Sequence, residues 1–87
     1  MLLAPERILT PDDIAEINLL SLFNLSNSQA GLKIHSHDAD PATVAAAERL
    51  HAKGLLTQPD GGYLTSLGLD AAEHSQTLLT ILRTPRS

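Results

Sequence analysis

The clearest pattern of apolar and polar positions lies between residues 49 and 73, where a helical spacing gives way to an extended one and then returns. Gly54 can adopt the left-handed conformation that ends a helix, and Leu55 would then contact Leu50 across a Schellman-type end. Pro59-Asp60-Gly61 combines a restricted φ, a side chain that bonds its own backbone and a residue that tolerates positive φ. This segment therefore predicts a helix end, a β-hairpin and the start of another helix.

The chain after the hairpin has the spacing of one long helix. Thr65 is a suitable N-cap, although Gly68 should weaken the first turn because glycine is a poor helix former. The apolar residues that follow recur at intervals of three or four positions, as they do on one face of a helix. We expect part of this stripe to cover the core. It consists of Leu67, Ala71, Leu78, Ile81 and Leu82.

The first half of the chain predicts two further helices and a short strand. Thr10-Pro11-Asp12-Asp13 combines a capping hydroxyl, a proline and two acids, which is typical of a helix start. This helix should run to about Phe23. Residues 31–35 alternate in polarity as a strand does, and Asp40-Pro41 predicts the start of the next helix.

The predicted order is helix, strand, helix, strand, strand, helix (α-β-α-β-β-α). We expect an α+β fold that is winged-helix-like, with a small three-stranded antiparallel sheet, in one domain over residues 1–87. A full winged-helix domain has a further helix before the recognition helix. Only residues 36–39 are available for it, so we expect the first half of the helix-turn-helix to be missing.

The run that begins Arg49-Leu-His-Ala-Lys-Gly-Leu-Leu and continues through a glycine turn to Leu64-Thr65 resembles the wing of MarR-type winged-helix regulators. The resemblance covers about the last half of the chain. Residues 17–82 also resemble a small family of short, uncharacterised bacterial winged-helix-like proteins that are sometimes labelled DNA-binding. Together these resemblances imply a winged-helix fold whose terminal helices pair in a dimer.

Composition narrows the class of protein further. A chain of 87 residues, 43% of them hydrophobic, buries roughly 60% of its unfolded surface, which makes a small core that a partner chain would help. The chain contains no cysteine, which excludes disulfides and suits a reducing compartment. Residues 1–4 are too short an apolar run for a signal peptide, and nothing approaches a membrane span. We therefore expect a cytoplasmic protein without membrane contact.

The charges argue against strong DNA binding. Six Lys and Arg face ten Asp and Glu, and the net charge of −4 opposes the counterion release that drives binding to duplex DNA. Residues 38–47, the reading half of the second predicted helix, are acidic and rich in alanine, so they offer no side chain suited to base edges. Arg49 and Lys53 lie together on the exposed side of that helix, and Lys33 could join them. These three are weak candidates for phosphate contacts.

Histidines are the other candidates for chemistry. On a strand, His35 and His37 would lie on the same side and could share a metal ion, but tetrahedral sites need three or four protein ligands. We therefore expect no metal and no cofactor. His51 and His74 should be half-buried and hydrogen-bonded. Asp and Glu residues gather at helix starts rather than in an acid-base pair, and we expect no enzymatic activity.

The first and last predicted helices carry more apolar surface than a small core needs. The apolar arc of the last helix, extended by flanking positions, is wider than one small core requires, and the second half of the first helix, residues 19–23, is also apolar nearly all round. We expect these helices to meet their copies in a homodimer. Candidate interface residues are Leu22, Ala72, Leu78, Leu79 and Leu82, of which Leu79 is the best single candidate.

The sequence thus favours a cytoplasmic, non-enzymatic regulatory or protein-interaction module that forms a homodimer, with a further protein partner left open. A DNA-binding transcriptional regulator, with Arg49 and Lys53 on phosphate, is the alternative. A metal-binding module through His35 and His37 ranks third.

Overall fold

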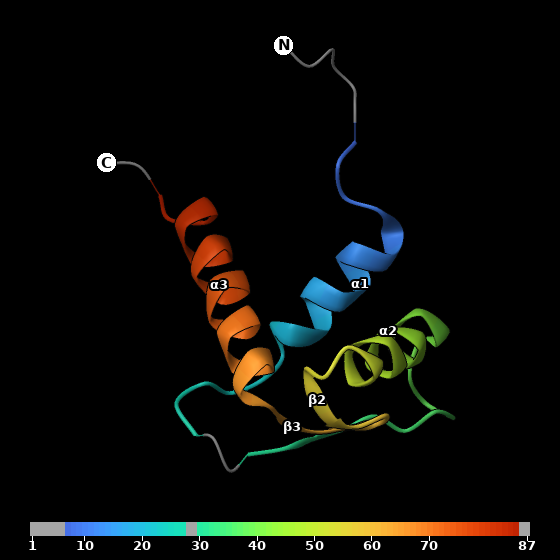
Figure 1. Ribbon diagram of the computed structural model, residues 1–87. Helices are drawn as coiled ribbons and strands as arrows, with labels where there is room; N and C mark the ends of the chain where they lie inside the picture. The colour runs from blue at the N-terminus through green and yellow to red at the C-terminus, as the bar shows by residue number, and fades with distance from the viewer. Residues whose placement is uncertain (1–6, 28–29, 86–87) are drawn as a thin grey trace.

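Three helices and a three-stranded antiparallel sheet make up the part of the chain that the computed structural model describes, residues 7–27 and 30–85 (Figure 1). The strand order in the sheet is β1-β3-β2. The predicted α+β class and α-β-α-β-β-α order are confirmed, and the topology is winged-helix-like. In chain order the elements are α1 (Pro11–Leu20), β1 (Leu32–Lys33), α2 (Pro41–Ala52), β2 (Leu56–Gln58), β3 (Gly61–Leu64) and α3 (Ser66–Leu82).

Each of these helices begins at a polar residue that caps its first turn. The Thr10 hydroxyl accepts from the Asp13 N–H at 3.1 Å, and the Asp13 carboxylate accepts from the Thr10 N–H at 3.0 Å, which is a capping box. Asp40 and Thr65 each accept a first-turn N–H at 3.0 Å. The predicted starts of the helices are therefore confirmed.

The end of α2 has the predicted Schellman geometry. Gly54 has φ 82°, the Leu55 N–H donates to the Leu50 carbonyl at 2.9 Å, and the Gly54 N–H donates to the His51 carbonyl at 3.0 Å. These two bonds satisfy carbonyls that the helix end would otherwise leave without partners. They also turn the chain directly into β2.

α1 ends at Leu20, earlier than the predicted Phe23. The Ser21 hydroxyl donates to a carbonyl one turn back at 2.8 Å, and the Leu22 N–H forms a tighter, 3₁₀-type bond to Leu19 at 3.1 Å. This change of geometry turns Leu22 outward and Phe23 into the core. The apolar run at the end of α1 is therefore divided between core and surface.

β1 is also shorter than the predicted strand over residues 31–35, because the chain turns after Ile34. Lys33 pairs with Gly61 of β3, and the Ile34 N–H extends the pairing with a 2.9 Å bond to the Asp60 carbonyl. Gly61 has φ 119°, and a Cβ there would overlap the Leu32 carbonyl oxygen. Only glycine allows β1 and the hairpin to approach this closely.

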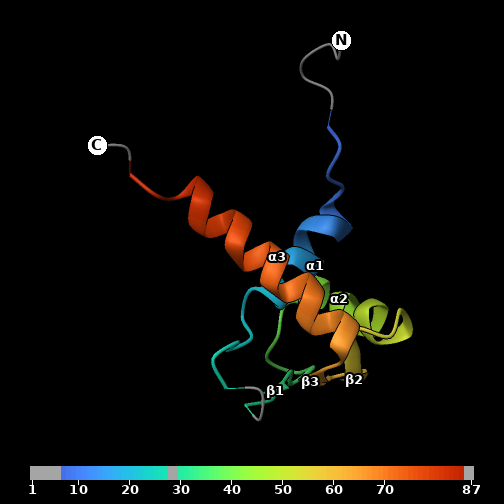
Figure 2. The ribbon, with the colours of Figure 1, turned by 60° about the vertical axis from the view of Figure 1, so that its left-hand side comes forward.

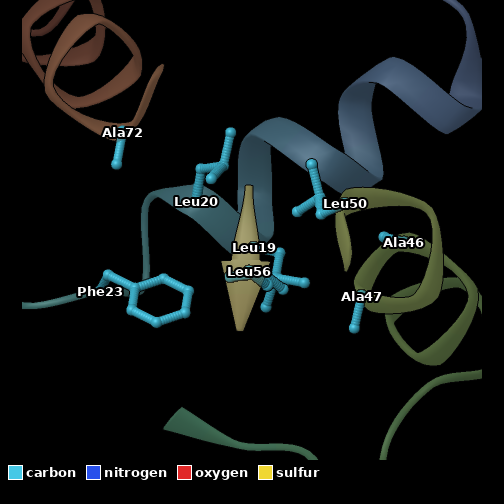
Figure 3. Close-up of a cluster of buried hydrophobic side chains, with 8 residues drawn as sticks. All are labelled: Leu19, Leu20, Phe23, Ala46, Ala47, Leu50, Leu56 and Ala72. Carbon is cyan, nitrogen blue, oxygen red and sulfur yellow. The ribbon is translucent and has the colours of Figure 1, made fainter. Parts of the chain in front are cut away.

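The core lies where α1 meets α2, β2 and the first half of α3 (Figure 3). α1 lies between α2 and α3, and the sheet packs against α2 and the N-terminal end of α3 (Figure 1, Figure 2). The C-terminal half of α3 extends beyond this core. The buried apolar residues are Leu19, Leu20 and Phe23 from the α1 region, Ala46, Ala47 and Leu50 from α2, Leu56 from β2 and Ala72 from α3.

Candidate functional site

Arg49 of α2 and Lys53 at its C-cap form an ion cluster with α1. The Arg49 Nε donates to the Glu16 carboxylate at 3.0 Å, and the Lys53 Nζ donates to the other carboxylate oxygen of Glu16. Arg49 also donates to the Asp12 carbonyl oxygen at 3.4 Å and lies 3.8 Å from the Asp12 carboxylate. Both carboxylate oxygens of Glu16 are therefore occupied by cations from the neighbouring helix.

Glu16 is the one buried charged residue of the described chain, and its side chain is only 11% exposed. Burial by itself would raise the pKa of this carboxyl, but the hydrogen bonds from Lys53 and Arg49 outweigh burial and hold the pKa below its usual range. Glu16 is thus ionised at neutral pH and joins α1 to α2. An ionised carboxylate has no proton to donate, and both oxygens of Glu16 are bonded to cations.

This cluster changes the interpretation of Arg49 and Lys53. The structure brings the two residues together, as expected, but on the side of α2 that faces α1, and the Arg49 side chain is only 33% exposed. The expected solvated face is therefore wrong for Arg49. A phosphate would have to compete with Glu16 for both cations.

Lys33, the third candidate for phosphate contacts, lies on the sheet rather than in this cluster. Its Nζ donates to the Asp60 carboxylate at the tip of the hairpin. The hydrogen bond from Lys33 is the main reason that the pKa of Asp60 lies below its usual range. All three basic candidates thus have an acidic partner within the same chain.

His35 and His37 lie outside β1, so the expected strand alternation does not apply to them. Residues 36–38 form a turn, in which the Asp38 N–H donates to the His35 carbonyl at 2.9 Å. Both histidines line an open groove of about 610 Å³ whose apolar walls include Val44 and Ala47 of α2. Within residues 7–27 and 30–85, no three His, Asp or Glu side chains are placed to share a metal ion.

The other two histidines are exposed, so the expectation that they are half-buried is wrong. The His74 side chain is 80% exposed, and its Nδ1 lies 2.7 Å from the Asp70 carbonyl oxygen and 3.6 Å from the Asp70 carboxylate. The hydrogen bond to the Asp70 backbone, followed by the Asp70 and Glu73 charges, raises the pKa of His74. His51 lies near the end of α2 without a place in the core.

α3 is rotated about its axis relative to the prediction. The side that packs on α1 carries small and polar residues: Ala72 is fully buried, the Ser75 hydroxyl lies 2.8 Å from the Ser21 hydroxyl, and the Gln76 amide donates to the Leu20 and Phe23 carbonyls at 3.2 and 2.8 Å. The Gln76 bonds satisfy carbonyls at the end of α1 and just after it. Figure 3 shows Ala72 pointing from α3 into the core, on the side where Leu20 and Phe23 lie.

The predicted core stripe of α3 is consequently exposed. Leu67, Leu78, Ile81 and Leu82 are 57%, 55%, 65% and 69% exposed. Of the interface candidates, Ala72 is excluded because no part of it reaches the surface, and Leu79 is half-buried beside Ser21. Leu22, Leu78 and Leu82 remain on the surface.

Sequence reasoning missed three functional or structural positions. Glu16 is an acid between apolar residues of α1, and Arg49 and Lys53 are one turn apart, so each was a candidate for an ion pair, but the sequence does not show that they meet. Ser75 and Gln76 interrupt the apolar sequence of α3, but no pattern in the sequence shows that their partners are at the end of α1.

Comparison with known proteins adds one finding. No curated protein and no solved structure matches the chain. No helix of the described chain has the length and apolar content that crossing a membrane requires. A family model matches residues 7–83, which include every helix and strand of the described chain and the whole ion cluster. The chain therefore belongs to that family, a family of unknown function (DUF5669).

Proposed function

We propose that the chain is a non-enzymatic regulatory or protein-interaction module that acts as a homodimer. The observation that carries the proposal is the outward side of α3, where Leu67, Leu78, Ile81 and Leu82 are each more than half exposed. Contiguous apolar surface beyond a few hundred Å² is rare on proteins that stay monomeric and commonly marks a contact with another macromolecule.

The position of this surface supports the same proposal. The C-terminal half of α3 extends beyond the core (Figure 1), so a partner can approach it without first displacing α1 or the sheet. The inward side of α3 is held by Ser75 and Gln76, whose hydrogen bonds fix which side faces outward. The exposed leucines are therefore a defined surface and not a poorly packed core.

The chemistry of the buried charges supports a non-enzymatic role. Glu16 is the buried carboxylate of the described chain, and its oxygens bond Arg49 and Lys53. A general acid needs a proton that a substrate can reach, a general base needs a free lone pair, and either needs a pKa near the working pH. The pKa of Glu16 is lowered, which moves it away from neutrality.

The cytoplasmic location stays a prediction, based on the cysteine-free composition.

The homodimer is tested by sedimentation velocity of the full chain at high micromolar concentration. We expect a dimer for the parent protein and a folded monomer for Leu78→Glu, because the variant places a charge in an apolar contact on both copies. Thr80→Glu adds the same charge to an exposed α3 position outside the apolar side and is the matched control. A parent chain that sediments as a monomer would contradict the homodimer.

DNA binding is the second candidate, because the topology is winged-helix-like and α2 occupies the place of a recognition helix. The pairing of Arg49 and Lys53 with Glu16 opposes it, as does the net charge of −4. We expect weak binding to a random duplex at low salt. Tight binding with a steep salt dependence, reduced by Arg49→Ala and Lys53→Ala but not by Arg83→Ala, would establish the DNA-binding regulator instead.

A further inference from the structure

The exposed apolar residues of α3 belong to a longer, regular row. Leu67, Ala71, His74, Leu78 and Ile81 follow one another at alternating intervals of four and three residues. This spacing is that of the a and d positions of a coiled coil, in which Ala71 and Leu78 occupy a and the other three occupy d. We call these five residues the α3 seam.

The α3 seam is accessible for most of its length. Leu67, Leu78 and Ile81 are more than half exposed, and the His74 side chain is 80% exposed. A shallow groove of about 360 Å³ runs along the same side, lined by Glu73, His74, Thr77, Leu78 and Ile81. A heptad row on a single helix buries little by itself, and such rows are covered by a second helix.

The seam is complementary to a second, antiparallel copy of itself. In antiparallel pairs the a residues of one helix lie beside the d residues of the other. With a two-fold axis between His74 and Leu78, His74 of one copy lies beside Leu78 of the other, and Ala71 lies beside Ile81. The second contact joins a small residue to a large one, which lets the two helices interdigitate. Both contacts occur twice because the interface is isologous.

The charges along α3 favour the same orientation. Asp70 and Glu73 lie in its first half, whereas Arg83 lies at its C-cap. A parallel pair would bring the acids of one copy beside the same acids of the other and would align the two helix dipoles. In the antiparallel pair, Asp70 comes level with the Arg83 end of the second helix. The C-terminal end of α3, which Arg83 caps, is also the part of the helix that extends beyond the core, so two copies can approach each other there (Figure 1, Figure 2).

We propose that two copies of the chain pair antiparallel through the α3 seam, with the two-fold axis crossing α3 between His74 and Leu78. The arrangement rests on the homodimer of the proposed function and specifies its interface. The imidazole of His74 is the one polar side chain of the seam. A polar residue at a seam position reduces affinity but selects one register among several, since shifted registers leave it against less suitable neighbours.

The absence of cysteine from the chain makes the proposal testable by disulfide trapping in the full-length protein. Two single-cysteine proteins, His74→Cys and Leu78→Cys, are oxidised separately and as an equimolar mixture, and the products are weighed by mass spectrometry. We expect the mixture to give mainly the mixed disulfide, because antiparallel pairing brings these two positions within the short Cα separation that a disulfide requires. Each protein alone should cross-link far more slowly.

Three controls make the outcomes distinct. Thr80→Cys, on α3 but outside the seam, measures random collision, and equal trapping there would overturn the proposal. Rapid trapping of His74→Cys with itself would show a parallel pair and would also overturn it. A parent that sediments as a dimer, combined with no trapping at the seam, would leave the homodimer standing and refute this interface. A monomeric parent would refute both.

A second variant tests the role of His74. We expect His74→Leu to tighten the dimer about tenfold, because it completes the apolar seam, and to let the disulfide pattern spread to neighbouring registers. Thr77→Leu, an exposed α3 position beside the seam, should change affinity much less. Weaker association of His74→Leu than of the parent would contradict a place for His74 in an apolar interface.

Discussion

The two sides of α1 are packed by different means. On one side, α2 buries Ala46, Ala47 and Leu50 against α1 and adds the ion cluster around Glu16. On the other side, α3 buries two small residues, Gly68 and Ala72, and adds hydroxyl and amide hydrogen bonds, while Leu67, Leu78, Ile81 and Leu82 face outward. α2 therefore serves the fold of the single chain, whereas half of α3 is shaped for a contact outside it.

The sharpest way to break this comparison is to shorten a leucine on each side. Leu50→Ala removes a side chain that is 1% exposed, and we expect it to lower the free energy of unfolding by about 3 kcal/mol through lost burial and a residual cavity. Leu82→Ala makes the same change on α3, where we expect less than about 0.5 kcal/mol. Urea unfolding in dilute solution, where association contributes little, measures both. Equal losses would show that α3 is part of the core.

The features that the sequence predicts correctly are the local ones, and the orientation of α3 is not among them. Local chemistry fixed the helix starts at Thr10, Asp40 and Thr65 and the turn at Gly54, because a cap and its partner are a few residues apart. Topology followed from these boundaries. The outward rotation of α3 did not, because periodicity identifies an apolar face without saying whether the face is covered by its own chain or by another.

The candidate site was less accessible to sequence reasoning. Arg49 and Lys53 were correctly placed together, since both lie on one turn of α2, but their partner Glu16 is more than thirty residues away. Only the packing of α1 on α2 brings these charges together. The same holds for Ser21 and Ser75, whose 2.8 Å contact joins distant segments.

A smaller effect tests why α3 packs so closely at its start. A Cβ at Gly68 would overlap the Leu55 carbonyl oxygen, so the glycine marks a close approach and does more than weaken the helix. We expect Gly68→Ala to lower the free energy of unfolding by about 2 kcal/mol, because backbone must move to relieve the overlap. The opposite result, the gain of about 1 kcal/mol that alanine gives at an unhindered helix position, would show that the approach is loose. Thr77→Ala on the exposed side of α3 is the control.

The smallest expected change in the free energy of unfolding comes from the ion cluster around Glu16, which lies between α1 and α2. Glu16→Gln keeps a hydrogen-bond acceptor but removes the charge, and we expect it to lower the free energy of unfolding at neutral pH by about 1 kcal/mol. The pKa of Glu16 is lower in the folded chain than in the unfolded one. The ionised carboxylate therefore stabilises the fold fully above the ordinary Glu pKa of about 4.3, and this stabilisation is lost as the pH falls from there through the lower folded pKa.

Denaturant titrations of the parent and Glu16→Gln at a series of pH values test this directly. The difference in unfolding free energy should be constant near neutrality and should shrink as the pH falls below about 4.3. Glu73→Gln changes an exposed carboxylate on α3 and should give a small difference throughout. If the Glu16→Gln difference stayed constant into acid, the ion cluster would contribute nothing to stability. Arg49 and Lys53 would then be held only weakly by Glu16 and could bind phosphate without a cost in stability.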